Sequence, residues 1–171
     1  MCVRWCWVFL FCFFTAQGNQ IGRPGPRYEV KEQKTNAYIS SGFFAGGDKS
    51  TTIVKLKDIR CGKPTKEYER IVLDLESQTE KQAMPYFQVQ VAPEEGRMVL
   101  SVWADVQYDF DIQKTQKTFL KSKKIKKLNV VPRLEDGLAI VEFTLHPDKA
   151  KNIKFEVFQL YKPNRIIVDL L

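Results

Sequence analysis

The sequence of 171 residues carries 27 lysines and arginines against 20 aspartates and glutamates, which gives a formal net charge of +7. This length suits one domain with its own hydrophobic core, so a small scaffold held together by disulfides is excluded. The four cysteines agree with that exclusion, because Cys2, Cys6 and Cys12 all precede residue 18 and leave Cys61 as the single later cysteine.

Residues 1–18 have the pattern of a secretory signal peptide, and we predict that they are removed. Arg4 provides a basic start, residues 5–14 form a continuous apolar run, and Ala16 and Gly18 place small residues before the cleavage point. The run is shorter than the roughly 20 residues that a membrane span needs, which disfavours the alternative of an uncleaved anchor. We therefore expect an exported protein of the periplasm or cell envelope.

The basic charge of the exported part narrows its expected partners. Loss of Arg4 with the signal peptide leaves 26 basic residues against 20 acidic ones, a net charge of +6. A basic protein outside the cytoplasm meets anionic wall glycans, acidic lipids and lipopolysaccharide, whereas nucleic acid is not an expected partner there.

Residues 19–50 contain several glycines and prolines among polar residues, and neither a helical nor a strand period persists. This composition predicts an extended linker before the folded domain. The alternative is a loop docked on the domain, with Phe43 and Phe44 as its anchor.

From residue 51 onward, short runs rich in valine, isoleucine, phenylalanine and leucine alternate with turn residues, which is typical of strands. Apolar and polar residues alternate within many runs, as in Ile71, Leu73 and Leu75, and this predicts antiparallel sheets with one wetted face. We expect an all-β sandwich of two antiparallel four-stranded sheets over residues 51–171. The four expected hairpins are 52–60 with 69–75, 86–91 with 97–104, 125–131 with 138–145, and 153–161 with 165–171.

Four of these strands repeat one short pattern, a basic residue followed by an apolar triplet, a polar residue and an apolar residue, although the third copy begins with leucine. The copies begin at residues 70, 97, 138 and 165, so their first residues step by 27, 41 and 27 positions. This spacing describes two copies of a two-part unit offset by 68 residues, and it predicts an internal duplication.

The longer step contains an insertion, residues 109–127, that is rich in lysine and has no strand alternation before Ile125. A short amphipathic helix and a loop are both compatible with it. Its amines have two possible roles. They form a patch that binds an anionic wall polymer or an acidic membrane surface, or they form a solvated region that aids solubility. The candidate binding lysines are Lys114, Lys117, Lys121, Lys123, Lys124, Lys126 and Lys127.

The repeated strands at residues 69–75 and 163–170 resemble the two recurring strands of the AMIN domain, which accompanies exported N-acetylmuramoyl-L-alanine amidases and pilus secretins. The resemblance covers residues 52–171 and implies a pair of four-stranded sheets that localises its host to peptidoglycan and has no catalysis of its own. The lysine-rich insertion departs from the family pattern. Since the chain ends at Leu171 without an amidase or secretin domain, we expect a stand-alone binding module or a subunit of an envelope assembly.

The charged residues of the two resembling strands have two possible roles. Arg70, Asp74, Arg165 and Asp169 could bind sugar or peptide groups on an exposed sheet face, since a guanidinium binds a carboxylate through two hydrogen bonds. Alternatively, they pair with each other across strands and stabilise the sheet.

Other polar residues give weaker signals. His146 follows a predicted strand and is expected in a surface turn, Cys61 is expected as a small buried side chain, and together they offer only a remote nucleophile and base pair. Trp103 is expected to pack on the sheet, with a sugar-stacking platform as the alternative. The sequence has no phosphate-binding loop and no metal-ligand cluster, so we expect neither a cofactor nor a metal.

The sequence therefore predicts an exported, non-catalytic envelope protein that binds or localises to peptidoglycan or another anionic wall polymer. The alternative is a structural subunit of a pilus or secretion assembly that uses a sheet edge, or the apolar surface around Phe43 and Phe44, to contact its partners.

Overall fold

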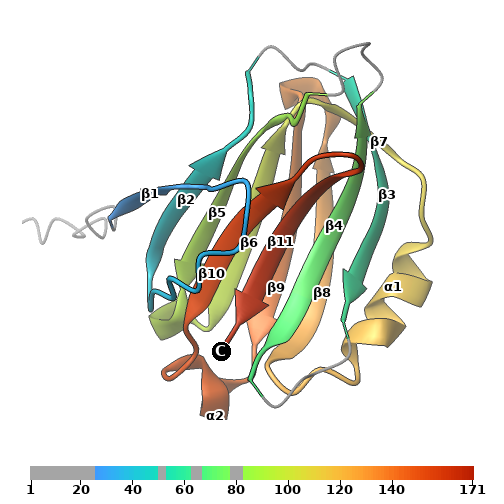
Figure 1. The fold of residues 1–171 in the computed structure, drawn as a ribbon. Coiled ribbons are helices and arrows are strands. Elements are labelled where there is room, and N and C mark those ends of the chain that lie inside the picture. Colours follow the sequence, from blue (N-terminus) through green and yellow to red (C-terminus); the bar gives the residue numbers. More distant parts are fainter. Residues whose placement is uncertain (1–25, 50–52, 63–66, 78–82) are drawn as a thin grey trace, which may run out of the picture.

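The computed structural model describes residues 26–49, 53–62, 67–77 and 83–171, so the predicted signal peptide lies outside the described residues. Two β-sheets face each other with the hydrophobic core between them (Figure 1). The six-stranded sheet has the order β1 (Arg27–Glu29), β2 (Gly42–Gly46), β5 (Tyr86–Ala92), β6 (Arg97–Trp103), β9 (Leu138–Leu145), β8 (Ile125–Arg133). The five-stranded sheet has the order β10 (Phe155–Leu160), β11 (Asn164–Leu170), β4 (Glu69–Ser77), β3 (Ile53–Cys61), β7 (Asp105–Tyr108).

The predicted all-β class is confirmed, but the prediction of two four-stranded antiparallel sheets is wrong in detail. The eight predicted strands form the four antiparallel hairpins β3–β4, β5–β6, β8–β9 and β10–β11. Three further strands widen the sheets, and the pairs β1–β2 and β3–β7 are parallel. Both sheets are therefore mixed.

The strand order agrees with the predicted duplication. Adding 68 to the first residues of β3, β4, β5 and β6 (53, 69, 86 and 97) gives 121, 137, 154 and 165, close to the first residues of β8, β9, β10 and β11 (125, 138, 155 and 164). When each strand is replaced by its counterpart in the other half, the order β5-β6-β9-β8 of one sheet becomes the order β10-β11-β4-β3 of the other. Each sheet therefore takes one hairpin from each half, and the four repeated segments form the adjacent pairs β6–β9 and β4–β11.

The alternation read from the repeated strands sets the core. Ile71, Leu73 and Leu75 of β4 point inward and are almost fully buried, as predicted. The opposite face of the five-stranded sheet is not exposed to solvent throughout, because Val72, Phe158 and Ile167 form a second small apolar cluster there. Strand β10 is buried on both faces over Phe155–Gln159.

Residues 26–49, which we call the N-terminal arm, dock on the sandwich, so the linker prediction is wrong for this part and the docked alternative describes it. The arm contributes β2 to the six-stranded sheet beside β5. It also bridges to β10 of the five-stranded sheet through Lys31 with Phe158 and Ile39 with Phe155. Phe44 is buried in the core, whereas Phe43 stays half-exposed on the outside. The arm thus closes one open side of the sandwich.

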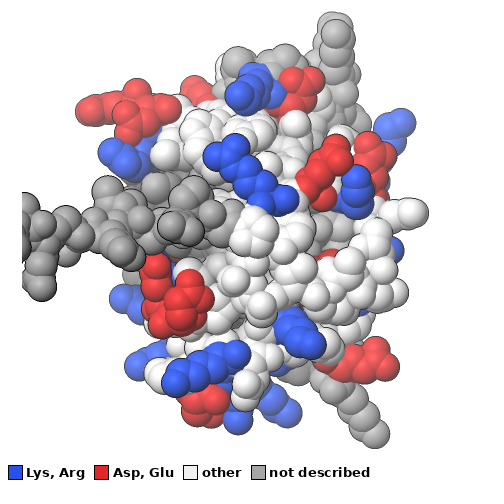
Figure 2. Space-filling model, turned by 90° about the vertical axis from the view of Figure 1, so that its left-hand side faces the viewer, with Lys and Arg blue, Asp and Glu red and all other residues white. Residues whose placement is uncertain are grey.

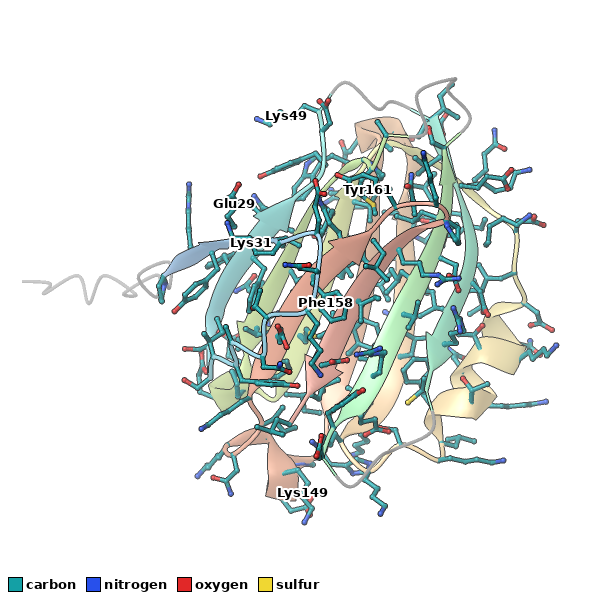
Figure 3. The ribbon with its side chains drawn as sticks, in the orientation of Figure 1. Glu29, Lys31, Lys49, Lys149, Phe158 and Tyr161 are labelled. Carbon is teal, nitrogen blue, oxygen red and sulfur yellow. The ribbon has the colours of Figure 1, made fainter. Side chains whose placement is uncertain are left out.

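Charges of both signs are scattered over the edge of the molecule that the arm covers (Figure 2). Glu29, Lys31 and Lys49 lie along it (Figure 3). At its end the arm approaches the next strand closely: Gly47 has φ +76°, and a Cβ there would meet the Pro85 carbonyl oxygen at 1.9 Å. Glycine is therefore required where the arm turns away.

The predicted insertion contains the helix α1 (Ile112–Phe119), so the helical alternative is confirmed. Asp111 caps it by accepting hydrogen bonds from the backbone N–H groups of Gln113 and Lys114. Phe119 is almost fully buried and packs on Phe143 of β9, with ring centroids 5.8 Å apart. The helix contacts β3 and β8 on the side of the sandwich opposite the arm (Figure 1).

Three short helical turns complete the elements: the 3₁₀ turns Pro93–Glu95 and Leu134–Asp136, and the helix α2 (Pro147–Ala150). Over the ranges that the structure describes, no helix has both the length and the apolar character to cross a membrane.

Candidate functional site

The charged residues of the repeated strands meet across the β4–β11 pair. The antiparallel register places Arg70 opposite Asp169 and Asp74 opposite Arg165. Arg70 donates two hydrogen bonds to Asp169, at 2.6 and 2.8 Å, and Arg165 donates one to Asp74 at 2.8 Å. The cross-strand pairing that the sequence offered as an alternative is therefore confirmed.

Asp169 is buried and joins neighbouring elements. The expectation that it binds sugar or peptide groups on an exposed sheet face is therefore wrong for this residue. Its side chain has no exposed surface, and Lys34 of the N-terminal arm adds a third hydrogen bond at 2.8 Å. Burial works against the charged form of Lys34, but the bond to Asp169 outweighs it and raises the pKa of the amine above its ordinary value. The Lys34 amine also lies 3.8 Å from the centre of the Tyr68 ring.

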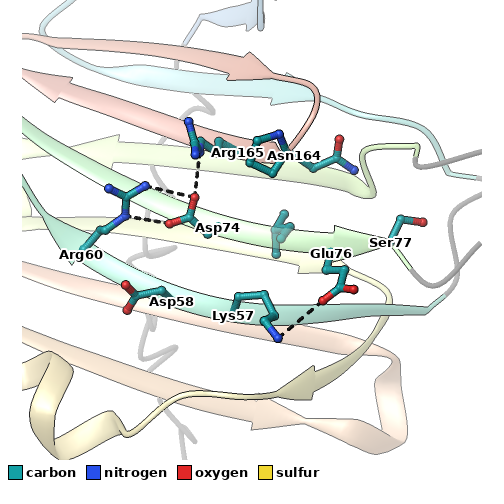
Figure 4. A pocket seen from close by; sticks show the side chains of 10 residues that line it. Lys57, Asp58, Arg60, Asp74, Glu76, Ser77, Asn164 and Arg165 are labelled. Atoms are coloured by element: carbon teal, nitrogen blue, oxygen red, sulfur yellow. Dashed lines mark hydrogen bonds and ion pairs between the residues drawn. The ribbon is translucent and has the colours of Figure 1, made fainter.

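Asp74 lies at the centre of a second group of ion pairs, shown in Figure 4. Arg60 of β3 donates two hydrogen bonds to it, at 2.7 and 3.1 Å, in addition to the bond from Arg165. Burial alone would raise the pKa of Asp74, yet the two guanidinium groups together hold it below the ordinary value. Arg60 is not among the candidate site residues that the sequence indicated.

We expect the Asp74 ion pairs to make folding stability depend on acidity. A carboxyl whose folded-state pKa is lowered adds stability that is present above its unfolded pKa and is lost as the pH falls through the folded value. The advantage of the parent over Asp74→Asn in free energy of unfolding should therefore shrink below about pH 4. Urea unfolding at steps between pH 6 and pH 3 measures it, and an advantage that grows on acidification would contradict the assignment.

These ion pairs line a shallow pocket of about 430 Å³ on the outer face of the five-stranded sheet. Its cations are paired: Lys57 and Arg60 of β3 and Arg165 of β11 contact the carboxylates of Glu76 and Asp74 on β4, and Lys57 also contacts Asp109 at 2.6 Å. Its acidic lining residues are Asp58, Asp74 and Glu76. Because the cations of this groove are already paired with carboxylates, the groove attracts an anionic polymer only weakly.

The lysine-rich insertion gives a different arrangement. Lys114, Lys117 and Lys121 border a second pocket of about 430 Å³ between α1 and the ends of β3 and β4. All three are exposed, and among the described residues none of them has an ion-pair partner. The structure therefore gathers three of the seven proposed lysines, which we call the lysine cluster.

The other four proposed lysines point elsewhere. Lys124 is half-buried, and its amine donates to the Leu170 carbonyl oxygen at 2.7 Å, with a pKa lowered by burial. Lys123 is exposed beyond α1, and Lys126 and Lys127 are exposed on the outermost strand β8. Lys124 is therefore a structural residue, since its amine fastens the C-terminal strand.

Cys61 lines the pocket beside the lysine cluster, but its chemistry does not suit a nucleophile. Its thiol lies 3.2 Å from a Glu69 carboxylate oxygen, and burial together with that negative charge raises its pKa to about 12. A thiol is reactive as the thiolate, so Cys61 stays protonated and unreactive at neutral pH. His146 lies in the turn before α2, as predicted, where its carbonyl accepts the Ala150 N–H at 2.9 Å.

Trp103 lies on the outer face of the six-stranded sheet and contacts Tyr86 of the neighbouring strand, with ring centroids 5.3 Å apart and the ring planes tilted by 46°. The expected packing on the sheet is thus confirmed where Trp103 meets Tyr86, while the ring as a whole stays 38% exposed.

No protein-family model matches the sequence, and a search of curated proteins finds no match either. The resemblance to AMIN domains therefore remains a prediction.

Proposed function

We propose that this chain is an exported, non-catalytic envelope protein that binds peptidoglycan or another anionic wall polymer through the lysine cluster of α1. The single observation that carries the proposal is the grouping of Lys114, Lys117 and Lys121 around one pocket in which none of them forms an ion pair with a described side chain. Among the described residues that line this pocket, the one carboxylate is that of Glu69, which is buried and accepts hydrogen bonds from the Cys61 thiol and the Lys124 backbone N–H. Kinship with AMIN domains is part of the same proposal, since that family localises to peptidoglycan.

Charge matching separates this pocket from the ion-paired groove of the five-stranded sheet. In the groove, each cation already faces a carboxylate, so an incoming anion would have to displace an existing pair. At the lysine cluster, the amines are solvated and free to exchange water and counterions for the carboxylates of stem peptides. Such contacts between exposed charges are weak singly and are screened by salt.

Replacing Lys114, Lys117 and Lys121 together by glutamine should weaken binding to purified sacculi by about tenfold, because three exposed ion pairs of about 0.5 kcal/mol each are lost. Co-sedimentation across a salt series measures this, and the parent should lose its advantage at high salt.

The matched control replaces Lys149, Lys151 and Lys154 by glutamine, which removes the same charge from exposed positions around α2. Lys149 projects from that end of the molecule in Figure 3. The control variant should bind sacculi as strongly as the parent does. Equal losses in both triple variants would show that net charge alone acts, and a parent that stays in the supernatant at low salt would refute wall binding altogether.

The alternative function, a structural subunit joined through a sheet edge, has less support. Edge strands recruit partners when their backbone is open and uncharged. Here β8 carries Lys126, Lys127 and Pro132, β1 and β7 have three and four residues, and β10 is bridged by the N-terminal arm.

A further inference from the structure

The outer face of the six-stranded sheet carries a strip of uncharged side chains, which we call the aromatic strip: Phe43 and Ala45 of β2, Tyr86 and Gln88 of β5, and Ser101 and Trp103 of β6. The register joins them, because Ala45 lies opposite Gln88, Gln88 opposite Ser101, and Tyr86 opposite Trp103. Trp103 is 38% exposed, and the other five are half-buried.

Two rings of this strip, Tyr86 and Trp103, are held in place. Tyr86 accepts a hydrogen bond on its hydroxyl from the Gln88 side-chain amide at 2.6 Å. Trp103 packs against the Tyr86 ring in a tilted arrangement, and the Lys49 amine lies 5.2 Å from the Tyr86 ring centre. Fixed rings lose little conformational entropy on binding, which favours recognition by stacking.

The surface beside the rings is hollowed. A depression of about 120 Å³ is lined by Arg27, Phe43, Ala45, Tyr86 and Gln88. A larger one, of about 420 Å³, shares Ala45 and Tyr86 with the first and is also lined by Glu29, Lys31 and Glu32 of the N-terminal arm. Phe43 and Tyr86 are separated by about 14 Å, from a rise of about 3.3 Å per residue and a strand spacing of about 4.8 Å. The strip is therefore long enough for more than one ring of a ligand.

The chemistry of the strip selects a neutral ligand rich in hydroxyl groups. Aromatic faces attract the C–H faces of flat rings, and Gln88 and Ser101 offer hydrogen bonds to hydroxyl and amide groups. None of the six side chains is charged, and the charged residues beside them have both signs: Arg27 lines the smaller depression, and Glu29, Lys31 and Glu32 line the larger one. The strip itself therefore favours a ligand without a net charge. A lipid surface would instead require a larger apolar area rimmed by cations.

We propose that the aromatic strip binds the neutral backbone of a polysaccharide, with sugar rings stacked on Trp103 and Phe43. This inference rests on the proposed function and deepens it, since it separates a glycan-backbone site on the sheet from the anion site at α1. The lysine cluster lies beside β3 and β8, whereas the strip lies on β2, β5 and β6.

Calorimetric titration of the full chain with a neutral hexasaccharide of β-1,4-linked N-acetylglucosamine tests this directly. The parent should bind it with an affinity that changes little with salt. Trp103→Ala and Phe43→Ala should each weaken binding by about tenfold, the size of loss typical of aromatic anchors. Tyr161→Ala, which removes an equally exposed ring outside the strip, should bind as the parent does.

The outcomes of this titration and of the sacculus experiment are distinguishable. Absence of heat with the hexasaccharide, or equal affinity in the parent, Trp103→Ala and Phe43→Ala, overturns the glycan site even if the lysine variant loses sacculus binding. Hexasaccharide binding that depends on both rings, together with unchanged sacculus binding by the lysine variant, overturns the anion site alone. Because the two aromatic positions lie on different strands, a folding defect in one variant leaves the other as the test.

Discussion

Replacing Asp169 by asparagine is expected to lower the free energy of unfolding by about 3 kcal/mol, near the lower bound for breaking a buried ion pair. The carboxylate of Asp169 has no exposed surface and accepts hydrogen bonds from both Arg70 and Lys34. Asparagine keeps the shape but removes the charge, so two cations that are mostly withdrawn from water lose their counterion. Urea denaturation of the parent and the variant measures the difference.

Asp148→Asn provides the control for Asp169→Asn. Asp148 contacts Lys149 at 3.2 Å, but both side chains are well exposed, so its replacement should leave the free energy of unfolding unchanged. If the two variants were equally stable, Asp169 could not be the anchor that joins β4, β11 and the N-terminal arm.

Replacing Phe119 by alanine is expected to cost about 3–5 kcal/mol of folding stability and to weaken sacculus binding as well. Phe119 is 1% exposed and packs on Phe143, and it is the large apolar side chain that fastens α1 to the sandwich. Its removal leaves a cavity and loosens the helix that presents the lysine cluster. Binding should therefore fall although no lysine has been changed.

The neighbouring residue supplies the matched control. Leu120 is 78% exposed, so Leu120→Ala removes a side chain of similar apolar character without touching the core. It should change the free energy of unfolding by no more than about 0.5 kcal/mol and leave binding intact. A Phe119→Ala protein with parental stability would contradict the anchoring role.

Elements with a strong local period were predictable from the sequence. The inward set Ile71, Leu73 and Leu75 follows from alternation alone, because burial of one sheet face imposes a period of two. Strand β7 was missed because its four residues continue directly from the predicted strand before it, and its partner β3 lies some 50 positions earlier in the chain (Ile53 pairs with Asp105). Periodicity carries no information about such distant pairing.

The N-terminal arm was misread for a related reason. Its glycines favour a linker, yet Gly42 and Gly47 serve close approaches to Pro26 and Pro85, which only the folded sandwich creates. The docked alternative named Phe43 and Phe44, and the structure divides their roles: Phe44 enters the core, whereas Phe43 stays on the outer face.

At the candidate sites, the sequence identified many of the charged residues involved but not all of the side chains with which they pair. Pairing among Arg70, Asp74, Arg165 and Asp169 was a named alternative because equivalent positions of two similar strands invite it. The third partner, Lys34, was missed because it lies 135 residues from Asp169 in the sequence. The lysine run was visible as composition, but its division into a cluster at α1 and a half-buried Lys124 depends on helix geometry and on the turn before β8.

The role of the lysine cluster can be read most directly by mapping where the wall polymer touches the protein. Carbodiimide joins a carboxylate to an amine in direct contact with it, so the protein bound to sacculi can be coupled, digested and analysed by mass spectrometry for modified lysines. We predict modification of Lys114, Lys117 and Lys121, with Lys149, Lys151 and Lys154 left unmodified. Modification spread evenly over both groups, or confined to the lysines around α2, would contradict the proposed binding site.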